Sequence, residues 1–251
     1  MTEEELLQKR FIELAKRAYN SSVYTFTDFL GLAEQATFDR VKRTIQGIPY
    51  DTFGGASGAE RVMIRFGDEE ALGYEIPFPI VCIKAEPVSQ KFADKLTHRD
   101  FLGALLNLGI ERSTLGDIPI LNNVGYIFAS EDIAPFIISE LSRVKHTEVK
   151  LSIVDELPEG ELYKTERRRV QISGERLDAI IARVYSLSRE DAQTLFSKKL
   201  VYASGRLCES TSYNPKENET ISVRGHGRFI YRGFVSNSKK GKLNVEVDVY
   251  L

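Results

Sequence analysis

The stretch "SREDAQTLFSKKLVYASGR", residues 188–206, decides how the last third of the chain folds. Ser188 has Asp191 three positions later, which is the spacing of a helix N-cap and predicts that a helix begins here. The helical pattern ends at Lys198–Lys199, and a short apolar run then leads into the turn at Ser204–Gly205. The stretch therefore predicts a helix followed by a β-hairpin.

The residues before this stretch predict a second short helix on the same core. In "GERLDAIIARVYS", residues 174–186, apolar side chains recur at the spacing i, i+3, i+4, i+7, which gives one buried stripe. The stripe consists of Leu177, Ile180, Ile181 and Val184. Arg176 opens this helix outside the stripe, so we expect its side chain at the surface.

The cations of this module gather around the hairpin. A helix C-terminus favours a cation by about 0.3–1 kcal/mol, which accounts for one lysine but not for a group of them. Lys198, Lys199 and Arg206 lie within a few residues of one turn. Lysine and arginine neutralise phosphates and release counterions, and arginine also forks onto phosphate oxygens. The ridge therefore predicts contact with a nucleic-acid backbone.

Charge is distributed unevenly along the chain, although the net charge is only −2. Residues 164–251 hold 17 Lys and Arg against 10 Asp and Glu, or +7, and residues 1–163 hold 17 against 26, or −9. A basic module attached to an acidic body is typical of a protein in which one domain meets a polyanion.

Composition favours a globular protein without metal or cofactor. The 251 residues suffice for two or three domains. Two distant cysteines, Cys82 and Cys208, and three scattered histidines predict neither a disulfide framework nor a metal site. The N-terminus has no secretory pattern and no apolar run approaches a bilayer span. We expect a monomer in the cytoplasm, with no membrane partner.

The pattern of elements predicts an α+β protein of three domains. Residues 1–73 are expected to form a mainly helical domain, with helices across residues 2–45 and the second helix opening at Thr27. Residues 74–156 read β-α-β-β-α-β, the order of ferredoxin-like and RNA-recognition-motif-like domains. A linker is expected at residues 157–169 and the basic domain at 170–251. The middle segment lacks an aromatic base-stacking consensus, so its fold alone does not predict RNA binding.

The order "RLDAIIARVYSLSREDAQTLFSKKLVYASGR" resembles the S-four RNA-binding domain, also called the alpha-L motif. Its features are the R-L-D helix start, the Ser-Arg opening of the second helix, the basic helix end and the hairpin, with "NPKENETISVRG" as a later strand. Three further blocks, "FGGASGAERVMIRF", "HRDFLGALLNLGIERSTLGDI" and "ISVRGHGRFIYRG", extend the resemblance to the YlmH-type family of bacterial and plastid proteins.

This resemblance implies a non-catalytic protein that binds ribosomal RNA and tRNA on the large ribosomal subunit. The family is implicated in ribosome-associated quality control and has been linked to cell division, and a member from a plastid lineage is expected in the plastid stroma. Its RNA-contacting arginines fall on Arg176 and Arg189, with the Lys198, Lys199 and Arg206 ridge in support. We expect Arg176 and Arg189 to be RNA contacts and not structural salt bridges, because each opens a helix, where the dipole disfavours a cation. The hairpin carries Ser204 where the family usually has Asn, so a contact made by that amide would be lost.

Enzymatic alternatives have weaker support. "ERLD" also resembles pseudouridine synthases, which carry an S-four domain and a catalytic Asp, but those enzymes place a larger catalytic domain after it. The "HRD" at residues 98–100 lacks the Asn spacing and companion motifs of a kinase. The "GGASG" at 54–58 lacks the lysine and spacing of a phosphate loop. The alternatives that stay open are an RNA-modifying enzyme and a cell-division-linked RNA-binding factor.

Overall fold

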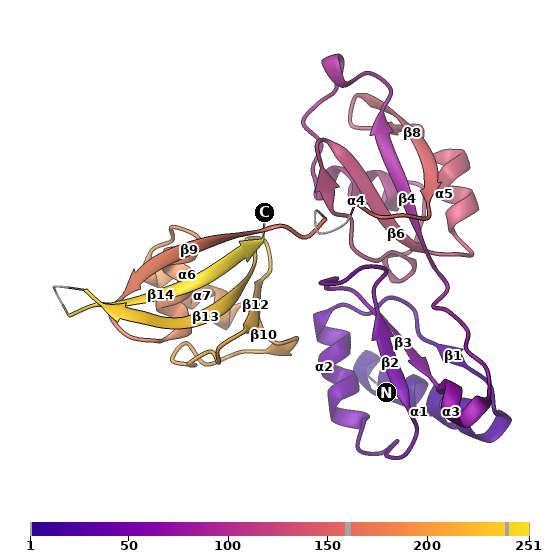
Figure 1. The fold of residues 1–251 in the computed structure, drawn as a ribbon, viewed down its shortest axis with the longest axis horizontal. Helices are drawn as coiled ribbons and strands as arrows, with labels where there is room; N and C mark the ends of the chain where they lie inside the picture. Colours follow the sequence, from indigo (N-terminus) through magenta and orange to yellow (C-terminus); the bar gives the residue numbers. More distant parts are fainter. Residues whose placement is uncertain (1, 159–161, 239–240, 251) are drawn as a thin grey trace. The chain divides into compact units, whose positions relative to one another are not determined.

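The computed structural model describes residues 2–158, 162–238 and 241–250. The chain forms two compact units, Met1–Leu162 and Tyr163–Leu251 (Figure 1). Both combine helices with antiparallel strands, which confirms the expected mixed α and β class. The first unit joins the segments expected as separate domains 1–73 and 74–156.

The N-terminal part of the first unit packs two helices against a small sheet. Helix α1 (Glu3–Ser21) begins with a capping box in which Thr2 and Glu5 each accept from the other's backbone N–H. The sheet has the order β1-β3-β2, from β1 (Thr25–Phe26), β2 (Tyr50–Phe53) and β3 (Met63–Phe66), and short α3 (Glu69–Leu72) follows it. This part is therefore mixed, and the helices cover less of residues 2–45 than expected.

The second helix begins later than the sequence indicated. Helix α2 spans Leu32–Val41, and residues 27–30 are extended because Thr27, Phe29 and Leu30 pair with residues of other segments. The Glu34 carboxylate accepts from the backbone N–H of Gly31 at 2.5 Å. This contact marks the helix start at Gly31, four residues after the expected start at Thr27.

The middle part forms a sheet covered by helices on one face. Its elements are β4 (Ile80–Pro87), α4 (His98–Asn107), β5 (Ile120–Leu121), β6 (Val124–Ser130), α5 (Ala134–Glu140), β7 (Arg143–Val144) and β8 (Thr147–Val154), with the 3-10 turns η1 (Gln90–Phe92) and η2 (Arg112–Thr114). The sheet order is β5-β6-β4-β8-β7. All pairs are antiparallel, so β4 and β5 run in the same direction on either side of β6, a split β-α-β arrangement.

The two faces of this sheet have different covers. Helices α4 and α5 pack Phe101, Leu105 and Ile137 against one face. On the other face, Phe29 and Met63 of the N-terminal part cluster with Phe128 of β6. Arg61 also joins the two parts, because its guanidinium donates to the backbone oxygens of Phe29, Arg112 and Leu115. These contacts explain why residues 1–162 form one unit.

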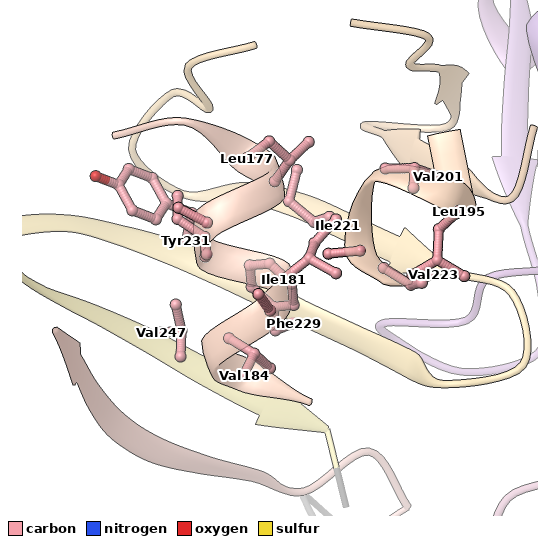
Figure 2. Close-up of a cluster of buried hydrophobic side chains, with 14 of the residues drawn as sticks. Leu177, Ile181, Val184, Leu195, Val201, Ile221, Val223, Phe229, Tyr231 and Val247 are labelled. Atoms are coloured by element: carbon pink, nitrogen blue, oxygen red, sulfur yellow. The ribbon is translucent and has the colours of Figure 1, made fainter. Parts of the chain in front are cut away.

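The C-terminal unit is an antiparallel sheet with two helices on one face. The helices are α6 (Leu177–Val184) and α7 (Arg189–Ser197), as the apolar spacing predicted. The strands are β9 (Thr165–Ile172), β10 (Val201–Ala203), β11 (Arg206–Leu207), β12 (Glu219–Val223), β13 (Gly227–Asn237) and β14 (Leu243–Tyr250), in the order β11-β10-β12-β13-β14-β9. Figure 2 shows Leu177, Ile181 and Leu195 of the helices packing among Ile221, Phe229 and Val247 of the sheet.

The structure differs from the expected linker at residues 157–169. Residues 165–172 form the edge strand β9, which pairs with β14 from Thr165↔Tyr250 to Leu243↔Ile172. The segment looks polar because β9 lies at a sheet edge, where its charged side chains remain exposed. The C-terminal unit therefore begins near Tyr163 and not at residue 170.

Within the described ranges, no helix is both long and apolar enough to cross a lipid bilayer. Within the same ranges, no group of three or more His, Cys, Asp or Glu side chains lies close enough together to hold a metal ion.

Candidate nucleic-acid interface

A buried carboxylate organises the surface where the two helices of the C-terminal unit meet. Asp178 lies in the first turn of α6 with 0% of its side chain exposed. Arg176 donates to both of its carboxylate oxygens, Nε to Oδ1 at 3.2 Å and Nη2 to Oδ2 at 3.1 Å. Arg189, at the start of α7, donates from Nη2 to Oδ2 at 2.9 Å, and Gln193 donates from Nε2 at 3.1 Å.

These contacts keep the buried carboxyl ionised. Burial opposes ionisation, but the hydrogen bonds from Arg176 and Gln193 and the charges of Arg189 and Arg176 outweigh it, so the pKa of Asp178 lies below its ordinary value. The α6 start is satisfied by backbone oxygens, because the N–H groups of Leu177 and Asp178 donate to Tyr213 and Thr211. The carboxylate is thus a fixed anion between two arginines.

The expectation that Arg176 and Arg189 form no structural salt bridges is wrong. Both pair with Asp178, and Arg189 does so in place of the nearer acids Glu190 and Asp191. The physical reason is Asp178, whose charge at the helix start offsets the dipole that disfavours the arginines. Both arginine side chains nevertheless remain accessible, with 45% of Arg176 and 46% of Arg189 exposed. The carboxylate fixes the orientation of both guanidinium groups through these hydrogen bonds.

The hairpin ridge lies where the sequence predicted. Lys198, the C-cap of α7, is exposed, and so is Lys199, whose Nζ lies 3.7 Å from the Glu209 carboxylate. Arg206 is exposed and pairs with Ala203 across the hairpin. These side chains belong to one helix end and the strand pair that follows it, so the ridge is a local feature of the chain.

The turn of this hairpin has a left-handed backbone at both central residues. Ser204 has φ 47° and Gly205 has φ 78°, the combination typical of a type I′ hairpin. Asparagine adopts a left-handed backbone more readily than serine, which explains why the family usually has Asn at the position of Ser204. The Ser204 hydroxyl donates to the Glu219 carboxylate at 3.2 Å, and Tyr213 donates to the same carboxylate at 3.0 Å. The turn is thus tied to β12 by its hydroxyl.

The three consecutive arginines at 167–169 serve the sheet as ion pairs. Arg167 and Arg169 lie on one face of β9 and contact Asp248 and Glu246 of β14 at 2.8 Å. Arg168 pairs with Glu166 on the same strand. The three arginines are therefore part of a cross-strand charge network, and not the solvated flank of a linker.

The aromatic face of the middle sheet is closed. Tyr126 is 8% exposed and Phe128 is 1% exposed, because Phe29 and Met63 cover them. Neighbouring Lys84 pairs with Glu86 at 2.8 Å on this face. Single-stranded RNA stacks on exposed aromatic side chains, so this face does not offer these two rings to bases.

Comparison with known proteins agrees with the sequence resemblance. The chain is 30% identical over 227 residues to the ribosome-associated protein quality control protein P2 of Bacillus subtilis, with 87% of this chain and 84% of the relative covered. The chain belongs to the YlmH family. Residues 78–156 match the family described as a putative RNA-binding domain in YlmH. A solved structure, the cell division protein ylmH from Streptococcus pneumoniae, aligns with a TM-score of 0.49 and 22% identity, over 61% of this chain and 92% of that one.

The sequence did not identify every residue of this surface. Gln193 was missed because a glutamine on a helix carries no distinctive signal, although its position one turn after Arg189 aims it at the same carboxylate. Arg224 and Arg228, which lie outside this cluster, belong to the family-like block "ISVRGHGRFIYRG" but were not predicted to bind RNA. Their spacing in "RGHGR", two arginines separated by Gly-His-Gly, was the available signal.

Proposed function

We propose that this YlmH-family protein is a non-catalytic RNA-binding factor that contacts ribosomal RNA and tRNA on the large ribosomal subunit, in ribosome-associated quality control. The name of the Bacillus subtilis relative and the description of the matching family support this proposal. The C-terminal unit, which has the helix-hairpin order of an S-four domain, supplies the principal RNA contacts.

The Arg176–Asp178–Arg189 cluster is the observation that carries the proposal. A buried anion holds two guanidinium groups side by side and leaves nearly half of each side chain exposed. Preorganised arginines bind phosphate oxygens through paired N–H groups and lose little side-chain entropy on binding. The Lys198, Lys199 and Arg206 ridge extends the cationic surface along the hairpin.

The geometry of Asp178 favours binding over catalysis. A catalytic carboxylate must reach the substrate, whereas Asp178 is fully buried and accepts hydrogen bonds from Arg176, Arg189 and Gln193. The residue that resembles the aspartate of pseudouridine synthases therefore has a positioning role in this proposal.

Cosedimentation with purified large ribosomal subunits tests the proposed function. We expect the full chain to bind, and we expect Arg176→Ala with Arg189→Ala to weaken binding while far-ultraviolet circular dichroism shows a folded protein. Mass spectrometry of the bound RNA is expected to find no modified base. Binding that survives both substitutions, or a new base modification that depends on the protein, contradicts the proposal.

A further inference from the structure

The turn "RGHGR", residues 224–228, joins β12 to β13 and carries three basic side chains, each packed on tyrosine. The Arg224 guanidinium carbon lies 5.0 Å from the centre of the Tyr202 ring. The Arg228 guanidinium carbon lies 3.9 Å from the Tyr250 ring centre and 5.1 Å from that of Tyr163. The His226 ring lies 5.5 Å from the Tyr185 ring. The turn is therefore held by aromatic contacts.

Arg224 and Arg228 differ from Arg176 and Arg189 in their partners. Among the residues that the structure describes, no carboxylate forms a salt bridge with either of them, whereas Arg176 and Arg189 share Asp178. A guanidinium that lies over an aromatic ring keeps its N–H groups free at the edge of its plane. These two side chains thus lie against tyrosine rings, and no carboxylate of the described residues pairs with their positive charge.

The surrounding face of the sheet adds to this charge. Ile221, Val223 and Phe229 point into the core beneath the helices, so the alternating positions Ser222 and Arg228 point to the face without helices. Arg167, Arg169 and Arg232 lie on this same face with Glu246 and Asp248. In the described part of the unit, the strands and turn of this face thus carry five arginines and two carboxylates. The arginines are Arg167, Arg169, Arg224, Arg228 and Arg232, and the carboxylates are those of Glu246 and Asp248.

We propose that the RGHGR turn and this helix-free face form a second RNA contact surface, at which Arg224 and Arg228 bind backbone phosphates. The inference rests on the proposed RNA-binding function and extends it to a surface separate from the Arg176–Asp178–Arg189 cluster. An RNA backbone fits the charge, because uncompensated guanidinium edges favour bidentate contact with phosphate oxygens. Glycines on both sides of His226, with φ 86° at Gly225 and 122° at Gly227, leave little side-chain bulk beside the arginines.

Salt-dependent binding of the full chain to unfractionated tRNA and to purified large ribosomal subunits tests this proposal. The variant Arg224→Gln with Arg228→Gln removes both charges and keeps much of each side-chain length. Two lost phosphate contacts are expected to weaken binding roughly tenfold or more and to reduce the log–log salt slope by about 1.4–1.8. The control Arg168→Gln removes an exposed arginine that pairs with Glu166, and is expected to change affinity less than twofold.

Two further variants separate charge from orientation and guard against unfolding. Tyr250→Leu keeps both arginines but removes a ring beneath Arg228, so we expect weaker binding with an unchanged salt slope. Arg224→Lys with Arg228→Lys keeps the charge and is expected to lose several-fold in affinity, because lysine lacks the planar fork. If the glutamine variant does not fold, unchanged affinity of the lysine variant overturns the proposal.

The outcomes distinguish this inference from the proposed function. Suppose that the wild-type chain binds RNA, that Arg176→Ala weakens this binding, and that Arg224→Gln with Arg228→Gln leaves it unchanged. That result disproves only the second surface. If the wild-type chain binds no RNA at low salt, both proposals are disproved. Equal competition by poly-glutamate, matched for charge, would indicate an acidic polypeptide as the partner and would also overturn the RNA assignment.

Discussion

At the scale of single residues, Asp178 ties the two helices of the C-terminal unit together through Arg176 and Arg189. The carboxylate is fully buried, and the side chains of the two arginines are each nearly half exposed. A buried anion with charged and neutral donors is costly to leave unpaired, which makes its partners sensitive to substitution. The same contacts that stabilise the fold orient the groups proposed to meet RNA.

The stability of the C-terminal unit is expected to depend on the ionisation of Asp178. Because the pKa of Asp178 is lowered in the folded chain, its contribution is fully present above the pKa of an unfolded Asp, near 4, and is lost as the pH falls through the lower folded value. We expect Asp178→Asn to destabilise the unit by roughly 2–3 kcal/mol at pH 7 and to flatten its decline toward pH 3. Calorimetric melts from pH 7 to 3 check this, and a pH profile identical to that of the wild type contradicts it.

Arg176 and Arg189 are expected to affect both folding and RNA binding. Arg176→Ala or Arg189→Ala should each lower stability by roughly 1–3 kcal/mol, because each leaves the buried Asp178 carboxylate with one charged donor fewer. Each should also weaken ribosome binding by roughly tenfold. Gln193→Ala is the matched control, because it removes a donor to the same carboxylate without removing charge. Thermal melts and cosedimentation of the three variants separate a role in folding from a role in RNA contact. Equal losses of ribosome binding in all three variants would show that the arginines act on binding only through the fold.

At the scale of elements, the buried side of helix α7 is expected to stabilise the fold, and its exposed C-terminal end is expected to contact RNA. Phe196 is 2% exposed and packs in the core, whereas Lys198 is exposed at the helix C-terminus. We expect Phe196→Ala to destabilise the unit by about 3–5 kcal/mol and Lys198→Ala to change its stability by less than about 0.5 kcal/mol. Urea titrations measure both, and comparable losses of stability would show that the surface assignment of Lys198 is wrong.

Local sequence pattern predicted the elements whose signal lies within a few residues. The stripe Leu177, Ile180, Ile181 and Val184 predicted α6, and all four side chains are buried. The Ser188 side chain caps α7 by accepting from the backbone N–H of Asp191, as its spacing indicated. These predictions held because caps and apolar stripes depend on neighbours along the chain.

Contacts between distant residues explain what the sequence did not predict. Strand β9 reads as a polar linker, because its partner β14 lies more than 70 residues away. The pairing of Arg189 with Asp178 crosses from one helix to the next, and nothing local favours it over Glu190 or Asp191. The stacking of Arg228 on Tyr250 likewise depends on the sheet, which brings the two strands together. Each is a tertiary contact that local spacing does not encode.

At the scale of the whole molecule, the boundary of the basic unit follows from strand pairing. We expect a fragment of residues 163–251 to fold, because it contains β9 and the core that the helices share with the sheet. A fragment of residues 170–251 lacks most of β9 and exposes the edge of β14, so we expect it to melt at a lower temperature or aggregate. Calorimetry of the two fragments checks this. Equal melting temperatures of the two fragments would contradict this boundary and support the linker expected at residues 157–169.

Positive charge is concentrated in the C-terminal unit, whereas the rest of the chain is acidic. Residues 164–251 carry +7 and residues 1–163 carry −9, so the two units are expected to respond oppositely to a polyanion. If the first unit contacts RNA through residues 78–156, the closed aromatic face leaves its other surfaces for that contact.

The salt dependence of RNA binding tests the central claim most directly. Affinity for large ribosomal subunits is measured for the full chain, for residues 163–251 and for residues 1–162, at several salt concentrations. Five phosphate contacts, at Arg176, Arg189, Lys198, Lys199 and Arg206, predict a log–log slope of roughly −3.5 to −4.5 in both the full chain and the C-terminal fragment, and the two contacts proposed at Arg224 and Arg228 make this slope steeper by about 1.4–1.8. A salt-independent affinity, or binding by residues 1–162 as strong as that by residues 163–251, would contradict the account.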